Sequence, residues 1–251
     1  MKDFDSVAYY DKVGRINGWD FSQMKFTSEG IGWDFYQEVV RACIPSDFLL
    51  DIGTGGGEAV LAIADSSQLI VGIDHSPGMI KTAAQNLKRA CFPNVRFVQM
   101  DAENLLFPND FYNVVSCRHS GFCAEEVARV LAPEGLFMTQ QVGERDKINL
   151  KAAFGRGQAY ETMPGTLMRG YIAELSAAGF RDIHFEEYNA VEYYEAPEDL
   201  FFLLTHTPII PNFGEMKGDM EVFEQFVADH MTDRGIITNA ERFMIVAKRR
   251  G

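Results

Sequence analysis

The sequence predicts an α/β fold in which a doubly wound, mostly parallel sheet carries helices on both faces. Short apolar runs alternate with helical stretches between residues 48 and 142. These runs lack the polar alternation of a sheet with one solvated face, which is typical of buried parallel strands. Right-handed crossovers through the intervening helices would join such strands.

Five parallel strands are expected in this region, because each apolar run is bounded by residues that favour turns. The expected strands are 48–52, 69–73, 95–99, 112–116 and 135–142. The helices between them have recognisable start and stop signals, such as Ser76 as the N-cap of one helix and Pro133 after another. The expected helices are 33–43, 57–64, 77–90 and 125–131.

Beyond residue 145 the pattern is less regular. We expect a helix at 166–178, a strand at 183–188 and two helices within 189–233. A closing hairpin is expected from strands 234–238 and 242–248, which would turn at Asn239 and Ala240. No repeat or low-complexity linker divides the chain, so we interpret residues 1–251 as a single domain.

Composition and charge exclude several classes of protein. The net charge of −13 and a pI near 4.8 disfavour a nucleic-acid partner, because attraction to phosphate backbones depends on Lys and Arg. The apolar content of 47% is enough for a packed core. No apolar run reaches the length of a membrane span and the first residues do not resemble a signal peptide, so we expect no membrane contact and a cytoplasmic protein.

The cysteines and histidines show no metal-binding spacing. Cys43, Cys91, Cys117 and Cys123 form neither a C-x-x-C motif nor a zinc-like group with the five histidines. We therefore expect buried free thiols and no metal site.

A glycine loop follows the first expected strand, with the spacing G-x-G-x-G from Gly53 to Gly57. Such a loop lets the backbone approach a ligand closely. Asp51 stands two residues before Gly53, where a carboxylate would repel a pyrophosphate and attract an ammonium group. The amino-acid end of a ligand fits this loop better than a diphosphate.

Two more aspartates follow the next strands. Asp74, at the end of the second strand, could accept hydrogen bonds from both hydroxyls of a ribose. Asp101, followed by Ala102 after the third strand, could accept from an exocyclic amine such as that of adenine. An amino acid, a ribose and an adenine in this order describe S-adenosylmethionine.

Over residues 45–145 the sequence resembles the class I S-adenosylmethionine-dependent methyltransferases, in the type 11-like group that acts mostly on small molecules. The motifs that carry the resemblance keep the order and spacing of that family. They are residues 49–58, 71–80, 98–104, 107–120 and 130–135.

The resemblance implies a Rossmann-like, seven-stranded sheet whose last strand, 242–248, is antiparallel. It also implies S-adenosylmethionine as cofactor, a helical lid at 1–45 and an inserted acceptor-side region at 189–233. The residues that it assigns to the cofactor are Asp51, Gly53, Thr54, Gly55, Asp74, His75, Met79, Asp101, Ala102 and Arg118. Tyr9 and Tyr10 would lie on the acceptor side, as a lid over the methionine end or as packing of an N-terminal helix.

The expected activity is transfer of a methyl group (EC 2.1.1.-) to a small-molecule acceptor by in-line displacement. His119, directly after the fourth strand, is the candidate general base, or else a loop histidine with local hydrogen bonds. Arg118 could bind an acidic acceptor or pair with a surface carboxylate. The sequence predicts neither the acceptor nor an oligomeric state.

Two other functions remain open at this point. One is a regulator that binds S-adenosylmethionine without catalysis. The other is a nicotinamide-dependent oxidoreductase, which Asp51 and the glycine spacing disfavour.

Overall fold

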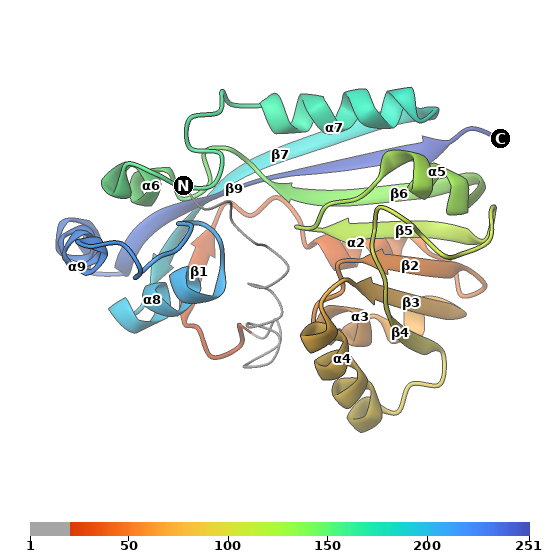
Figure 1. The fold of residues 1–251 in the computed structure, drawn as a ribbon, viewed down its shortest axis with the longest axis horizontal. Helices are drawn as coiled ribbons and strands as arrows, with labels where there is room; N and C mark the ends of the chain where they lie inside the picture. The colour runs from red at the N-terminus through yellow and green to blue at the C-terminus, as the bar shows by residue number, and fades with distance from the viewer. Residues whose placement is uncertain (1–20) are drawn as a thin grey trace.

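The computed structural model of the protein describes residues 21–251, whose strands form one sheet (Figure 1). The strands are β1 (Phe26–Glu29), β2 (Phe48–Ile52), β3 (Leu69–Asp74), β4 (Val95–Gln99), β5 (Tyr112–Arg118), β6 (Leu131–Val142), β7 (Phe180–Tyr194), β8 (Met231–Thr232) and β9 (Gly235–Arg249). Their order across the sheet is β1-β7-β9-β6-β5-β2-β3-β4, and β8 pairs with β9. The chain is thus a mixed, Rossmann-like α/β protein, as predicted.

Strands β2 to β6 are parallel to one another, and β9 is antiparallel to both β6 and β7. The strand order reverses between β2 and β5, because the chain runs outward from β2 to β4 and then returns to β5. In open α/β sheets, ligands bind outside the carboxyl ends of the strands at such a point. The topology therefore locates the candidate site at the ends of β2, β3, β4 and β5.

Helices cover both faces of the sheet, and further helices lie beyond the carboxyl ends of the parallel strands. They are α2 (Phe35–Ala42), α3 (Glu58–Ala62), α4 (Pro77–Ala90), α5 (Ala124–Val130), α6 (Ile148–Phe154), α7 (Thr166–Ala177), α8 (Pro197–His206) and α9 (Asp219–His230). Alternate strand residues enter opposite cores: Leu49 packs with residues of α2 and α3, and Leu50 packs with residues of α5 and α7. None of the helices described is long and apolar enough to span a bilayer.

Local signals explain the helix that the sequence predicted most accurately. Helix α4 begins after Ser76, whose hydroxyl accepts a hydrogen bond from the Met79 amide at 3.2 Å. Pro77 occupies the first helical position, where a missing N–H costs nothing. Both ends of α4 therefore agree with the prediction.

The predicted hairpin at Asn239 and Ala240 is wrong. Strand β9 is continuous, and Ala240 pairs directly with Ala190 of β7. The reason is the length of β7, which the sequence pattern predicted at 183–188. The strand extends to Tyr194, and its backbone pairs with β9 through the residues where the turn was expected. The hairpin lies earlier, between β8 and β9.

Two smaller expectations also differ from the structure. The segment expected as a helical lid contains strand β1, which pairs with β7. Of the four free cysteines only Cys117 is buried, and Cys91 is exposed at the left-handed C-cap of α4.

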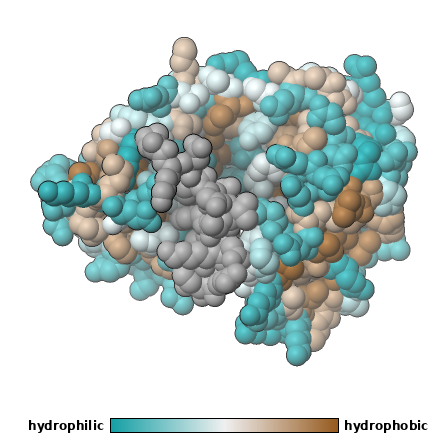
Figure 2. Space-filling view, in the orientation of Figure 1, coloured by the Kyte–Doolittle hydropathy of each residue, from teal (hydrophilic) through white to brown (hydrophobic). Residues whose placement is uncertain are grey.

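Hydrophilic side chains cover much of the face in Figure 2, and hydrophobic ones gather on the side of β2, β3 and β4.

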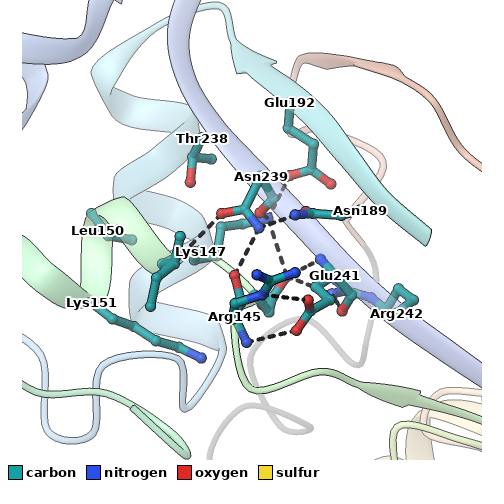
Figure 3. Close-up of polar contacts among 12 residues, drawn as sticks. Arg145, Lys147, Leu150, Lys151, Asn189, Glu192, Thr238, Asn239, Glu241 and Arg242 are labelled. Atoms are coloured by element: carbon teal, nitrogen blue, oxygen red, sulfur yellow. Dashed lines mark hydrogen bonds and ion pairs between the residues drawn. The ribbon is translucent and has the colours of Figure 1, made fainter. Parts of the chain in front are cut away.

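A group of buried charged side chains lies where the loop after β6 meets the two long strands β7 and β9. Figure 3 shows them converging from the loop after β6 and from β7 and β9. Lys147, which is 2% exposed, donates to Glu192 at 2.6 Å and to the Asn239 carbonyl at 2.9 Å. Asp146 accepts from Arg242 at 2.5 Å.

These ion pairs tie the loop after β6 to the two long strands. Removal of one partner would leave the other charge buried and uncompensated. We expect Lys147→Met to lower the free energy of unfolding by about 3 to 5 kcal/mol, and the double variant Lys147→Met/Glu192→Gln to lose clearly less. Denaturant unfolding measures both.

The matched control is Arg145→Ala, because the Arg145 side chain is 55% exposed in its ion pair with Glu241. An exposed pair contributes at most about 1 kcal/mol. Equal losses for the single Lys147 variant and the double variant would contradict the prediction.

Candidate functional site

The glycine loop after β2 packs closely against the ends of β3 and β5. Gly53, Gly55 and Gly57 have φ values of 74°, 58° and 78°, which side-chain-bearing residues rarely adopt. A Cβ atom on Gly53 would also overlap the side chain of Ser120. The Gly53 amide donates to the Ile73 carbonyl at 2.9 Å. Glycine is therefore required here for both conformation and space.

Asp74 at the end of β3 connects this loop to the start of α4. Its Oδ2 accepts from the Gly55 amide at 3.0 Å, and its Oδ1 accepts from the Ser76 amide at 2.9 Å. Burial raises the pKa of Asp74, and the hydrogen bonds from the Ser76 and Gly55 amides act in the opposite direction. A carboxylate has about four lone-pair positions, so the positions not used by these amides could still accept from hydroxyls.

Asp51 is fully buried in the centre of the sheet. The Ser116 hydroxyl of β5 donates to its Oδ1 at 2.6 Å, and the Tyr36 hydroxyl of α2 is 3.4 Å from the same atom. Burial raises the pKa of Asp51 to about 6. The groups that face this carboxylate directly are the hydroxyls of Ser116 and Tyr36. Its contact with a ligand ammonium stays a prediction.

The residues expected around the adenine and the loop occupy distinct environments. Asp101 is exposed, and its Oδ1 accepts from the Glu103 amide at 2.9 Å, so it forms a local turn. Ala102 is half-buried beside it. Met79 is 2% exposed in the first turn of α4. The buried Thr54 hydroxyl has no hydrogen-bond partner within residues 21–251.

His75 follows Asp74 on the loop between β3 and α4. Its side chain is 38% exposed, and its Nδ1 lies 3.9 Å from Asp74 Oδ1. The sequence thus brings His75, Asp74 and the glycine loop together, as expected from adjacent strand ends. Tyr9 and Tyr10 lie outside the described residues.

His119 belongs to a hydrogen-bonded chain that starts at Trp33, just before α2. The Trp33 indole Nε1 donates to Gln140 Oε1 at 2.7 Å, and Gln140 Nε2 lies 3.0 Å from His119 Nε2. An indole N–H only donates, so the Gln140 oxygen must face Trp33 and its NH₂ group must face His119. The Nε2 atom of His119 is therefore the acceptor, and the proton of the neutral ring is on Nδ1.

The surroundings of His119 disfavour a charged ring. Burial lowers its pKa well below the usual value, and the positive charges of Arg242 and Arg118 lower it further. Its Nε2 lone pair is already used by Gln140, so action as a base at that atom requires this bond to break. The role of His119 as a general base remains a prediction, and it requires that the hydrogen bond from Gln140 breaks first.

Arg118 lies beside the same group of residues. It is exposed at the end of β5, with its guanidinium carbon 5.8 Å from the centre of the Tyr36 ring. It forms no ion pair with any residue of the described part of the chain. The expected pairing with a surface carboxylate is thus not seen there.

Four residues that contact the site residues were not predicted from the sequence: Trp33, Tyr36, Ser116 and Gln140. One signal was present: Gln140 and Gln141 are consecutive amides inside an otherwise apolar strand, and buried amides need partners. The contacts of Trp33 and Tyr36 depend on how α2 packs, which the sequence pattern does not specify. Within residues 21–251 no group of His, Cys, Asp or Glu could hold a metal ion.

Comparisons with known proteins identify methyltransferases among the similar sequences. Residues 49–135 match the family model described as a methyltransferase domain. The chain is 34% identical over 103 residues to the uncharacterized methyltransferase YcgJ of Bacillus subtilis, a match that covers 38% of this chain and only 41% of YcgJ. It is 24% identical over 226 residues to the ubiquinone/menaquinone biosynthesis C-methyltransferase UbiE of Campylobacter jejuni, covering 74% of this chain and 91% of UbiE.

Solved structures share the fold. The crystal structure of YcgJ from Bacillus subtilis has a TM-score of 0.62 at 20% identity, over 86% of this chain and 98% of YcgJ. The [4+2]-cyclase SpnF has a TM-score of 0.57 at 19% identity, over 86% of this chain and 80% of SpnF. The second similarity is a reminder that fold alone does not define a reaction.

The fold and the matched segment together indicate the class of protein. The methyltransferase domain model matched at residues 49–135, the methyltransferase relatives and the shared fold support a class I S-adenosylmethionine-dependent methyltransferase. The resemblance found in the sequence is confirmed. Its use of S-adenosylmethionine is implied by the family.

The buried Asp51 generates a prediction about pH. Its pKa is about 6 in the folded chain against 3.8 for the free group, so the folded state binds more protons between these values. Stability should therefore fall as the pH rises from about 4 to about 6. Relative to the wild type, Asp51→Asn should gain up to about 3 kcal/mol of unfolding free energy across this range. Denaturant unfolding at several pH values checks this, and a pH-independent difference between the two proteins would contradict it.

Proposed function

We propose that the protein transfers a methyl group from S-adenosylmethionine to a small-molecule acceptor by in-line displacement (EC 2.1.1.-). The family and the fold support S-adenosylmethionine-dependent methylation in general. The observation that carries the proposal is the Asp74 carboxylate, which two backbone amides hold at the end of β3 beside the glycine loop. Its remaining acceptor capacity suits the paired hydroxyls of a ribose.

The other residues assigned to the cofactor are part of this proposal. Gly53, Thr54, Gly55 and Asp51 would contact the methionine end, and Asp101 with Ala102 would contact the adenine. His75 and Met79 would flank the ribose and adenine. The unpartnered Thr54 hydroxyl and the close-packed glycine loop fit a ligand that approaches the backbone.

Bound S-adenosylmethionine supplies a methyl group on a positively charged sulfur. Because this methyl group is already activated, the residues of the chain contribute position and exclusion of water. In this proposal Arg118 at the end of β5, the loop 119–121 after it and the amide of Gln140 would lie on the side where an acceptor meets the methyl group. A base is needed only for an acceptor whose proton is hard to lose.

The acceptor side is assigned to the segments beyond the carboxyl ends of the strands. The parallel strands point toward α6, α8 and α9, which share a third hydrophobic core (Figure 1). We propose that the chain is a single domain in which the region 189–233 and the N-terminal 1–45 enclose a small acceptor. The relatives whose printed names describe small-molecule methylation, such as UbiE, support this.

Labelled methyl transfer tests the proposed function. The full chain is incubated with labelled S-adenosylmethionine and fractionated small metabolites, and label is expected in a small-molecule fraction. S-adenosylhomocysteine binding with no transfer to any fraction would favour a regulator without catalysis. NADH binding with no response to S-adenosylmethionine would favour an oxidoreductase.

Asp74→Ala should weaken S-adenosylhomocysteine binding by about tenfold to a hundredfold, because hydrogen bonds to a charged group are lost. Calorimetry measures the dissociation constant. The matched control is Asp65→Ala, which removes an exposed aspartate in the turn after α3. Thermal unfolding checks that both variants are folded. Unchanged affinity in a folded Asp74→Ala variant would refute the role of Asp74.

A further inference from the structure

The guanidinium of Arg118 is a positive charge with several neutral or aromatic neighbours and no carboxylate partner in the described part of the chain. It lies over the Tyr36 ring. Burial raises the pKa of Asp51, Tyr36 and Tyr188 and the charge of Arg118 opposes this rise; burial lowers the pKa of His119 and the same charge lowers it further. Arg118 thus acts on groups from β2, α2, β7 and the loop after β5. An exposed cation at the meeting point of four elements is placed to bind an anion.

His119, the residue after Arg118 and one on which its charge acts, supplies a second donor. Gln140 and Trp33 hold His119 with its proton on Nδ1, and that N–H has no hydrogen-bond partner within residues 21–251. The other tautomer of the ring would carry its proton on Nε2, directly against the Gln140 NH₂ group. Two donors would then face each other. His119 therefore offers one fixed N–H group and no free lone pair.

The other nearby cation is already neutralised. Arg242 of β9 forms its ion pair with the buried Asp146 at 2.5 Å. Arg118 is therefore the available cation of the two.

Aromatic rings border this site. Trp33 and Tyr188 are packed edge to face, with ring centres 4.6 Å apart, and Tyr36 lies under Arg118. Flat apolar groups suit such a border, because aromatic pairs favour stacked and edge-to-face contact. The site thus combines an aromatic border with donors for a negative oxygen.

We propose that the methyl acceptor is a planar compound whose oxygen is already anionic, a carboxylate, phenolate or enolate, and that Arg118 and the Nδ1–H of His119 bind this oxygen. The inference rests on the proposed function and specifies its acceptor. It assigns His119 as a hydrogen-bond donor that holds the acceptor, in place of a general base.

The reaction then balances without a base. The anionic oxygen forms a bond to the methyl carbon while the bond from sulfur to that carbon breaks, and the electron pair of the broken bond stays on sulfur. A cation and an anion become two neutral products, and no proton has to be removed. This explains why a site with no free lone pair on His119 can still support transfer.

The first test measures the proton on His119. In the full chain with ¹⁵N-labelled histidine, NMR should show a neutral ring with the proton on Nδ1 between about pH 5.5 and 8. The charged groups that act on His119 are Arg242 and Arg118, and Arg118 acts in turn on Asp51, Tyr36 and Tyr188. A wild-type ring that is protonated on Nε2, or that becomes charged within this range, would overturn the inference.

Gln140→Glu should reverse the tautomer, because a carboxylate facing Nε2 accepts a hydrogen bond from a protonated Nε2 and raises the pKa of His119. The matched control is Gln68→Glu, which makes the same change at an exposed residue before β3. The control should leave the His119 signals unchanged. A Gln140→Glu variant that is folded but retains the proton on Nδ1 alone would contradict the hydrogen-bonded chain.

The second test uses benzoate and its neutral analogue benzamide as probes, with the protein saturated with S-adenosylhomocysteine. Calorimetry should show benzoate binding more tightly than benzamide. Arg118→Gln should weaken benzoate by about tenfold or more and remove the preference. The control Arg89→Gln, at an exposed position of α4, should bind both probes as the wild type does.

The anion on Arg118 has two possible sources, because the methionine end of the cofactor also carries a carboxylate. Affinities of Arg118→Gln for S-adenosylhomocysteine and for 5′-methylthioadenosine, which lacks that carboxylate, separate them. Loss for the first ligand alone would assign Arg118 to the cofactor and overturn the inference. Failure of the wild type to bind S-adenosylhomocysteine would overturn the proposed function as well. Normal binding of S-adenosylhomocysteine without preference for benzoate would overturn only the inference.

Discussion

The hydrogen bonds from the Gly55 and Ser76 amides to Asp74 are the interaction on which the candidate site depends. They connect the glycine loop after β2 to the beginning of α4 through a single carboxylate at the end of β3. Because both loops are held by one side chain, their backbone groups keep a fixed relation to each other. A ligand can then be recognised by positions that exist before it binds, which limits the ordering cost of binding.

Charge is distributed differently on the two sides of the site. Around Asp51 and Asp74 the chain gathers carboxylates that burial makes harder to ionise. Beyond β6, Lys147, Asp146 and Arg242 form a buried network in which the close contacts join opposite charges. Arg118 stands between these two regions without a carboxylate partner among residues 21–251. The proposed binding of an anionic acceptor depends on this position.

Particular elements show which features the sequence could predict. Strands β2 to β6 and helix α4 were predicted because their apolar runs and caps are local properties of the chain. The single strand β9 was not, because its continuity depends on pairing with distant residues of β7. The position of Asp74 at the end of a strand was also predicted, and its contact with a ribose stays a prediction. Gln140 and Trp33 were missed, because their hydrogen bond joins residues 107 positions apart.

By itself, the sequence determined the class of fold, the order of the motifs and the residue types at the strand ends, since these follow from spacing along the chain. The tertiary structure alone decided which polar atoms are already satisfied. It placed Ser116 and Tyr36 on Asp51, and it oriented His119 through Gln140 and Trp33. The physical reason is that a hydrogen bond depends on the distance and direction between two groups, and packing sets both.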